Sequence, residues 1–160
     1  MTKKNSLFFG VCALAAALCV CLAAACASAG AAFEPALNTD WFLAQIESDG
    51  AIITFNRGEL ADEGFAGAFS IRFAEGRAAG LGAPNRYTGP YTVKGASLSI
   101  GQPAATKMLA LRQPEGLTEN AYFAFLARTT GWRLADGRLF LDTRTEEGGA
   151  ASLVFARASD

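Results

Sequence analysis

Short apolar stretches separated by turn-forming residues recur after Trp41, and this pattern limits the possible fold more than any other feature of the chain. Phe69, Ile71 and Phe73 alternate with polar neighbours, which is typical of a strand with one buried face. Clusters such as Asp136-Gly137 fit the turns between paired strands. The pattern predicts eight or nine strands, at residues 41–46, 51–55, 69–73, 77–81, 87–93, 97–100, 132–134, 138–142 and 152–157.

One segment has the period of a helix instead, from about residue 118 to residue 130. Thr118 is suited to cap its first turn, Glu119 is favourable beside the helix N-terminus, and Gly131 is a natural stop. Its apolar face is formed by Tyr122, Phe125, Leu126 and Thr129. We therefore expect a mainly β (α+β) domain, an antiparallel sheet curled into a barrel or half-barrel with one packed helix.

Histidine and cysteine are missing from this predicted domain. The chain of 160 residues has no His, and its four cysteines, Cys12, Cys19, Cys21 and Cys26, all lie in the first 29 residues. Thiol nucleophiles, His general bases, the usual zinc sites, haem and iron–sulfur clusters are thereby excluded from the rest of the chain. The formal net charge is −1 without a basic run, which argues against nucleic-acid binding.

Residues 1–29 have the features of an export signal. Lys3 and Lys4 precede an uncharged apolar run, and Ala27-Ser28-Ala29 is a cleavage site of the A-x-A type. Small residues before Cys26 also resemble a lipobox, in which Cys26 would be lipidated and tether the protein to a membrane, although Ala23 stands where Leu is usual. The run is long enough to remain as an uncleaved anchor, which is a third alternative. All three alternatives predict an exported protein, with a linker at 30–40 and a domain at 41–158.

The domain offers few residues for chemistry. The acid pairs Asp62-Glu63 and Glu146-Glu147 are interpreted as solvated loop charges, since neighbours in a strand point to opposite faces. No motif singles out two carboxylates for glycoside hydrolysis, and neither Lys107 nor Ser97 has an evident activating partner. The sequence predicts no enzyme activity, no catalytic residue, no cofactor and no metal site.

Two stretches remain distinctive: residues 85–91, which read Asn-Arg-Tyr-Thr-Gly-Pro-Tyr, and residues 106–108, which read Thr-Lys-Met. By composition alone, Asn85 and Gly89 are turn formers, and the two tyrosines share a strand face. In this order, and with the strand that begins at Trp41, the chain from 41 to 156 resembles the META domain, the family of the bacterial heat-shock protein HslJ. The motif residues that carry the resemblance are Asn85, Arg86, Tyr87, Gly89, Tyr91, Thr106, Lys107 and Met108.

The resemblance implies a small antiparallel β domain of envelope proteins and lipoproteins, linked to stress responses and antibiotic tolerance, without an established catalytic activity. It also implies a cysteine pair at Pro84 and Ala110, which this chain lacks. We interpret the motif residues as determinants of the fold, with ligand binding as the alternative. The leading hypothesis is a non-enzymatic periplasmic or membrane-tethered protein that binds an unknown envelope protein or supports envelope stress tolerance. The alternative is a carrier that holds a lipid or other apolar ligand in a barrel cavity.

Overall fold

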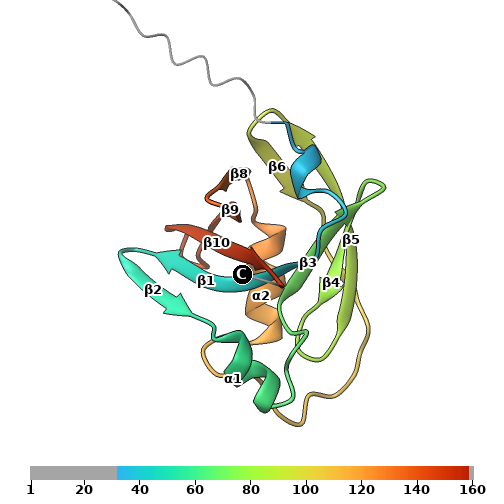
Figure 1. Ribbon diagram of the computed structural model, residues 1–160, viewed down its shortest axis with the longest axis vertical. Coiled ribbons are helices and arrows are strands. Elements are labelled where there is room, and N and C mark those ends of the chain that lie inside the picture. The colour runs from blue at the N-terminus through green and yellow to red at the C-terminus, as the bar shows by residue number, and fades with distance from the viewer. Residues whose placement is uncertain (1–31, 159–160) are drawn as a thin grey trace, which may run out of the picture.

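The strands form one antiparallel sheet that closes into a barrel (Figure 1). The computed structural model describes residues 32–158. The strands are β1 (Trp41–Ser48), β2 (Ala51–Thr54), β3 (Ser70–Ala74), β4 (Arg77–Leu81), β5 (Arg86–Lys94), β6 (Ser97–Ile100), β7 (Ala104–Ala105), β8 (Gly131–Ala135), β9 (Arg138–Arg144) and β10 (Ala150–Arg157). Their order is β10-β9-β8-β6-β5-β4-β3-β1-β2, with β7 beside β5, and the pairing of β1 with β10 completes the closure.

Three of the hairpins use a two-residue turn with both residues at positive φ. These are Asp49-Gly50, Glu75-Gly76 and Asp136-Gly137, with φ of 48° and 79°, 49° and 75°, and 51° and 75°. Turns of this kind match the twist of the strands that they join, and glycine adopts positive φ at little cost. The turn predicted at Asp136-Gly137 is therefore confirmed, and the three turns fix the register of the strands on either side.

The barrel closes because β1 has partners along its whole length. Its first residues pair with β3, its last four pair with β2, and β10 lies along its other edge with an irregularity between Leu43 and Gln45. The sequence left a barrel and a half-barrel open, and the structure has the barrel. Pro90 has no backbone N–H to donate to a neighbouring strand. Up to Pro90, β5 pairs with β4 and β7, and after Pro90 it pairs with β6. Because Pro90 lies where the partners change, its missing N–H costs the sheet little.

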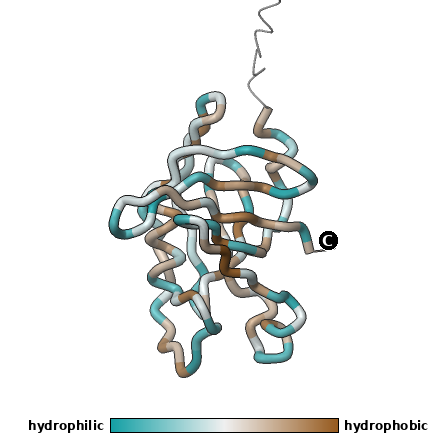
Figure 2. Tube along the Cα trace, turned by 90° about the vertical axis from the view of Figure 1, so that its left-hand side faces the viewer, coloured by the Kyte–Doolittle hydropathy of each residue, from teal (hydrophilic) through white to brown (hydrophobic). Residues whose placement is uncertain are grey.

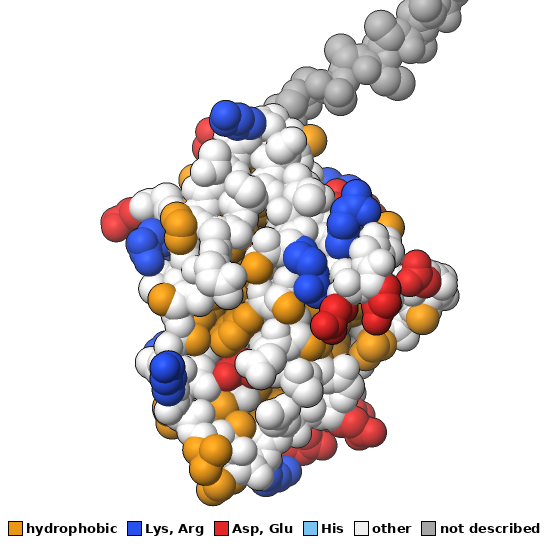
Figure 3. Space-filling model, turned by 180° about the vertical axis from the view of Figure 1, so that it is seen from behind, with side chains coloured by type: hydrophobic (Ala, Val, Ile, Leu, Met, Phe, Trp, Pro, Cys, Tyr) orange, Lys and Arg blue, Asp and Glu red, His pale blue; other side chains and the backbone are white. Residues whose placement is uncertain are grey.

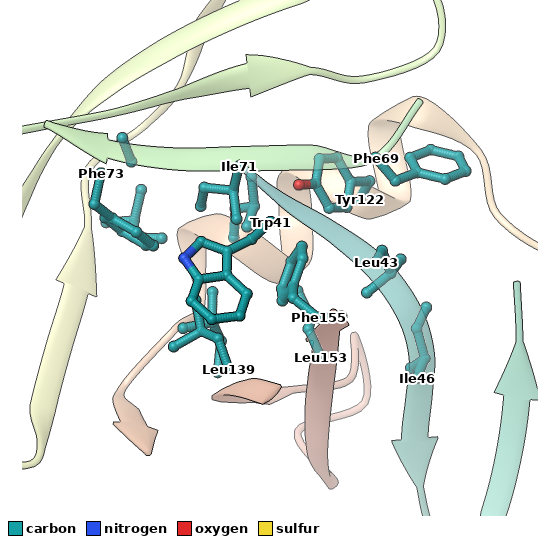
Figure 4. Packing of buried hydrophobic residues seen from close by; sticks show 14 of the residues in the cluster. Trp41, Leu43, Ile46, Phe69, Ile71, Phe73, Tyr122, Leu139, Leu153 and Phe155 are labelled. Carbon is teal, nitrogen blue, oxygen red and sulfur yellow. The ribbon is translucent and has the colours of Figure 1, made fainter. Parts of the chain in front are cut away.

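Apolar and polar residues alternate along the strands, and the apolar ones meet inside the barrel (Figures 2 and 4). The largest fully buried side chains are those of Trp41, Leu43, Phe69, Ile71, Phe73, Leu98, Tyr122, Leu126, Leu139, Leu141, Leu153 and Phe155. Most come from alternate strand positions, and Tyr122 and Leu126 come from the helix α2 (Glu119–Ala127). The packed helix and its cap are confirmed, with the Thr118 hydroxyl accepting a hydrogen bond from Ala121 N at 3.2 Å. The helix ends earlier than predicted, at Ala127, and Gly131 begins β8 instead of ending the helix.

A second, shorter helix, α1 (Arg57–Asp62), was not predicted. Asn56 caps it, with Oδ1 accepting from Gly58 N at 2.9 Å, and its Nδ2 donates to Glu59 Oε1 at 3.1 Å. An Asn followed three residues later by Glu is a recognised helix start, so the signal was present in the sequence. The six-residue helix buries Leu60 against the barrel.

The expected linker at 30–40 is wrong for the residues after Ala32. A short 3-10 helix, η1 (Glu34–Ala36), packs on the barrel, and Phe33 and Ala36 are buried. Phe33 contacts the rings of Phe73 and Trp132 at centroid distances of 5.1 and 4.7 Å. Burial of this apolar ring holds the segment in place, so the domain begins several residues before Trp41. The predicted signal, including Cys26, lies outside the described residues, and none of the described helices is long and apolar enough to cross a membrane.

Candidate functional site: an apolar loop held by Asn85

Asn85 connects the turn before β5 to the loop after β7. Its Oδ1 accepts hydrogen bonds from Thr106 Oγ1 at 2.8 Å and from Met108 N at 2.6 Å. Its Nδ2 donates to Met108 O at 3.2 Å and to Glu119 Oε2 at 2.6 Å. The side chain is almost fully buried, and all of its donors and acceptors have partners. One amide therefore holds both backbone groups of Met108.

Glu119 holds the same turn from the side of helix α2. Its Oε1 accepts from the backbone N–H groups of Ala83 and Asn85, each at 2.6 Å. Gly82 is required beside it, since a Cβ there would lie 2.5 Å from Glu119 Oε1 and 2.8 Å from Phe123 Cζ. The sequence predicted only that Glu119 is favourable in the first turn of the helix. In the structure, its carboxylate also binds helix α2 to the turn before β5.

The held loop presents apolar side chains to solvent. Met108, Leu109 and Leu111 are 62%, 84% and 89% exposed, and they are three of the five large hydrophobic residues that stand exposed in the described chain. Lys107 and Arg112 flank them, and the chain has no acidic residue between Glu75 and Glu115. In the view from behind, hydrophobic side chains stand out at this end of the molecule (Figure 3). We name residues 107–112 the apolar loop.

The motif residues fall into four groups. Asn85, Thr106 and Met108 meet in the network that holds the apolar loop, while Arg86 and Lys107 are exposed beside it. Tyr87 and Tyr91 lie on the inner side of β5, where Tyr91 packs against Phe73 at a centroid distance of 5.0 Å. Gly89 is not a turn former, because it lies within β5 and pairs with Ala78. A Cβ at Gly89 would approach Gly101 O to 3.0 Å, so glycine at this position allows the backbone after β6 to lie close to β5.

A second buried polar cluster lies under β3. The hydroxyls of Tyr87 and Tyr122 both contact the carbonyl of Ser70, at 2.8 and 3.0 Å, and lie 3.2 Å from each other. Burial raises the pKa of both tyrosines well above the ordinary value, so they stay protonated at neutral pH. A Cβ at Gly80 would collide with the Ser70 carbonyl, which explains glycine there. Buried, protonated phenols without access to a substrate fit a structural role.

The acid pairs named in the sequence analysis lie on the surface. Asp62, Glu63, Glu146 and Glu147 are exposed. Within residues 32–158, no three His, Cys, Asp or Glu side chains are grouped so that they could hold a metal ion. The single ion pair of the described residues, Arg72 with Asp40 at 3.3 Å, is solvent-exposed.

Large side chains fill the barrel interior that the described residues form, which argues against the carrier hypothesis. Phe69, Phe73 and Phe155 are fully buried inside it, and Phe125 is partly exposed at its end. Hollows of about 580 and 400 Å³ lie outside, on either side of Ser48, and both are open to solvent. The larger one is lined by the β1–β2 turn together with β9 and β10, and the smaller by Ile53, Leu117 and Phe125.

Sequence reasoning missed two parts of the site. Glu119 and Gly82 act through contacts between segments more than thirty residues apart, and no local pattern reveals such contacts. The apolar run from Met108 to Leu111 was visible in the sequence, but its exposure was not, because an apolar run is more often buried. The segments that contain Pro84 and Ala110 are joined here through hydrogen bonds of Asn85 rather than through a cysteine pair.

Comparisons with solved structures support the fold. The chain is similar to a protein from Burkholderia xenovorans solved by NMR, with 23% identity and a TM-score of 0.59 over 82% of this chain and 89% of that one. It is also similar to a DUF4847 family protein from Bacteroides vulgatus in a crystal structure, with 16% identity and a TM-score of 0.53 over 80% of this chain and 98% of that one. No curated protein sequence matches the chain.

The family follows from the sequence match. The model of the META domain matches residues 34–160, which includes every motif residue discussed above and begins at η1. The closed antiparallel barrel with one packed helix agrees with the fold expected from the resemblance. This chain belongs to the META domain family.

Proposed function

We propose that this protein is a non-enzymatic binding protein of the bacterial cell envelope, and that the apolar loop is its contact surface. The observation that supports this most is that a buried network of motif residues holds an exposed apolar segment. Exposing Leu109 and Leu111 to water is unfavourable, by about 25 cal/mol for each Å² of apolar surface. An interaction that covers them recovers that free energy, and contiguous exposed apolar residues commonly mark such contacts.

The proposed partner is a protein with an apolar pocket and an acidic rim. Lys107 and Arg112 flank the apolar side chains, so an acidic rim would complement the loop. The described chain begins just before η1, at the end of the molecule opposite the loop (Figure 1). If the predicted export signal or lipid tether holds the N-terminus at a membrane, the loop points away from that membrane and toward another envelope component. Support for envelope stress tolerance would follow from this contact.

Crosslinking in cells tests the proposal. A photoreactive amino acid placed at Leu109 or at Leu111 is expected to capture the same protein, and the same group at Asp136, an exposed hairpin turn, is expected not to capture it. Capture of lipid in place of protein would contradict the proposed partner class. Equal capture from all three positions would show that the loop is not a specific surface.

Leu109→Asp combined with Leu111→Asp is expected to weaken this capture at least tenfold and to remove the protein's contribution to survival under envelope stress. The free energy of unfolding should change by less than about 0.5 kcal/mol, because both side chains are exposed. The matched control is Ser99→Asp with Ala135→Asp, which adds the same charge at other exposed positions. Full stress tolerance in the loop variant, measured by survival of a complemented deletion strain, would argue against this function.

A further inference from the structure

The strand β2 has a free edge. It lies at the end of the strand order, pairs with β1 alone, and all four of its residues are exposed. Ile52 is 63% and Ile53 is 43% exposed. Edge strands are usually protected from further pairing by charged residues or proline. The sequence Ala51-Ile52-Ile53-Thr54 contains neither, so its backbone groups remain available.

The register shows which backbone groups are free. Ala51 is opposite Ser48 across the two-residue turn, a position at which the two residues exchange hydrogen bonds. Phe55 N donates to Ala44 O at 2.8 Å. The backbone N–H and C=O groups of the odd-numbered residues in this stretch therefore point toward β1. The N–H and C=O groups of Ile52 and Thr54 therefore point away from β1, spaced as a further strand requires.

The surroundings of this edge differ along its length. A hollow of about 400 Å³ beside Ile53 is lined by Ile46, Leu117 and Phe125 and contains no charged side chain. Another hollow of about 240 Å³, at the Thr54 end, is lined by Glu59, Glu63 and Glu115 without any Lys or Arg. Within residues 32–158, none of these three carboxylates forms an ion pair. The edge thus combines a backbone template, an apolar hollow and uncompensated negative charge.

We propose that β2 binds an extended segment of another protein, which adds a strand to the sheet and carries both apolar and basic side chains. The backbone of the segment pairs with Ile52 and Thr54. Apolar side chains of the segment lie over Ile53 and the apolar hollow, while Lys or Arg side chains beside the Thr54 end reach the three carboxylates. None of the residues that line this surface belongs to the apolar loop, so the two can be tested with different variants.

Thr54→Pro tests the backbone pairing. The N–H of Thr54 points away from β1, so proline removes a donor from the free edge and leaves the β1–β2 hydrogen bonds intact. Thr54→Val is the matched control, since it keeps the N–H. The probe is a capped Val-Lys-Val-Lys-Val-Lys peptide, and binding is followed by NMR through the amide signals of the isotope-labelled protein. The amides of Ile52 and Thr54 should shift most in wild type and in Thr54→Val, and affinity should fall at least tenfold in Thr54→Pro.

Charge is tested with a second peptide and a second variant. A Val-Glu-Val-Glu-Val-Glu peptide should bind at least tenfold more weakly than the lysine peptide, and the triple variant E59Q/E63Q/E115Q should remove most of this preference. The inference is overturned if the lysine peptide fails to bind at millimolar concentration, if Thr54→Pro binds it like wild type, or if the two peptides bind equally. Concentration-dependent dimerisation that Thr54→Pro abolishes would also overturn it, by showing that a second copy occupies the edge.

Discussion

Replacing Asn85 with alanine is expected to lower the free energy of unfolding by about 3 kcal/mol, because it leaves several buried polar groups without partners. The amide makes four side-chain hydrogen bonds, two of them to the backbone of Met108 and one to the Glu119 carboxylate. Chemical denaturation gives the change in stability. The matched control, Arg86→Ala, removes the exposed neighbouring side chain and should change stability by less than about 0.5 kcal/mol.

The same variant separates the two interpretations of the motif. If Asn85 positions the apolar loop, Asn85→Ala should increase amide hydrogen exchange across residues 106–112 more than in the barrel strands. It should also weaken crosslinking through Leu109, since the loop would no longer be held in one conformation. A variant that loses stability uniformly and keeps its crosslinks would show that Asn85 supports the fold alone. Normal stability would contradict the network itself.

Alkaline pH is expected to destabilise the protein through Tyr87 and Tyr122. Burial is the main cause that raises the pKa of each hydroxyl, so in the folded state both stay protonated above pH 10, where tyrosines of the unfolded chain ionise. The unfolded state then loses protons that the folded state keeps, and stability falls as pH rises. The contribution is complete below pH 10 and decreases by about 1.4 kcal/mol per pH unit for each tyrosine above it.

Tyr122→Phe isolates this effect. The variant removes one buried hydroxyl from the contact with Ser70, which should cost about 1 kcal/mol at neutral pH. Between pH 10 and 11.5, its stability should decline more slowly than that of wild type by the contribution of one tyrosine. The same change at the partly exposed Tyr91 should alter the slope less. Identical slopes in wild type and Tyr122→Phe would mean that the hydroxyl ionises as readily in the folded protein as in the unfolded chain.

Local patterns in the sequence determined most of the secondary structure. The alternation of Phe69, Ile71 and Phe73, the glycine turns and the capped segment after Thr118 predict strands, hairpins and α2, because each depends on residues close together in the chain. The missing His and Cys likewise exclude whole classes of chemistry without any structure. The linker was misplaced because burial of Phe33 depends on Phe73 and Trp132, which lie far away in the sequence.

Closure of the barrel and the surfaces that it leaves exposed were decided only by the tertiary structure. Whether β1 meets β10 depends on the twist and register accumulated over all the strands between them, which no local pattern specifies. Asn85 and Gly89 look like turn formers in the sequence, but one holds a distant loop and the other admits a neighbouring segment. Leu109 and Ile52 look like core residues, and their exposure follows from their places on the apolar loop and on the edge strand β2.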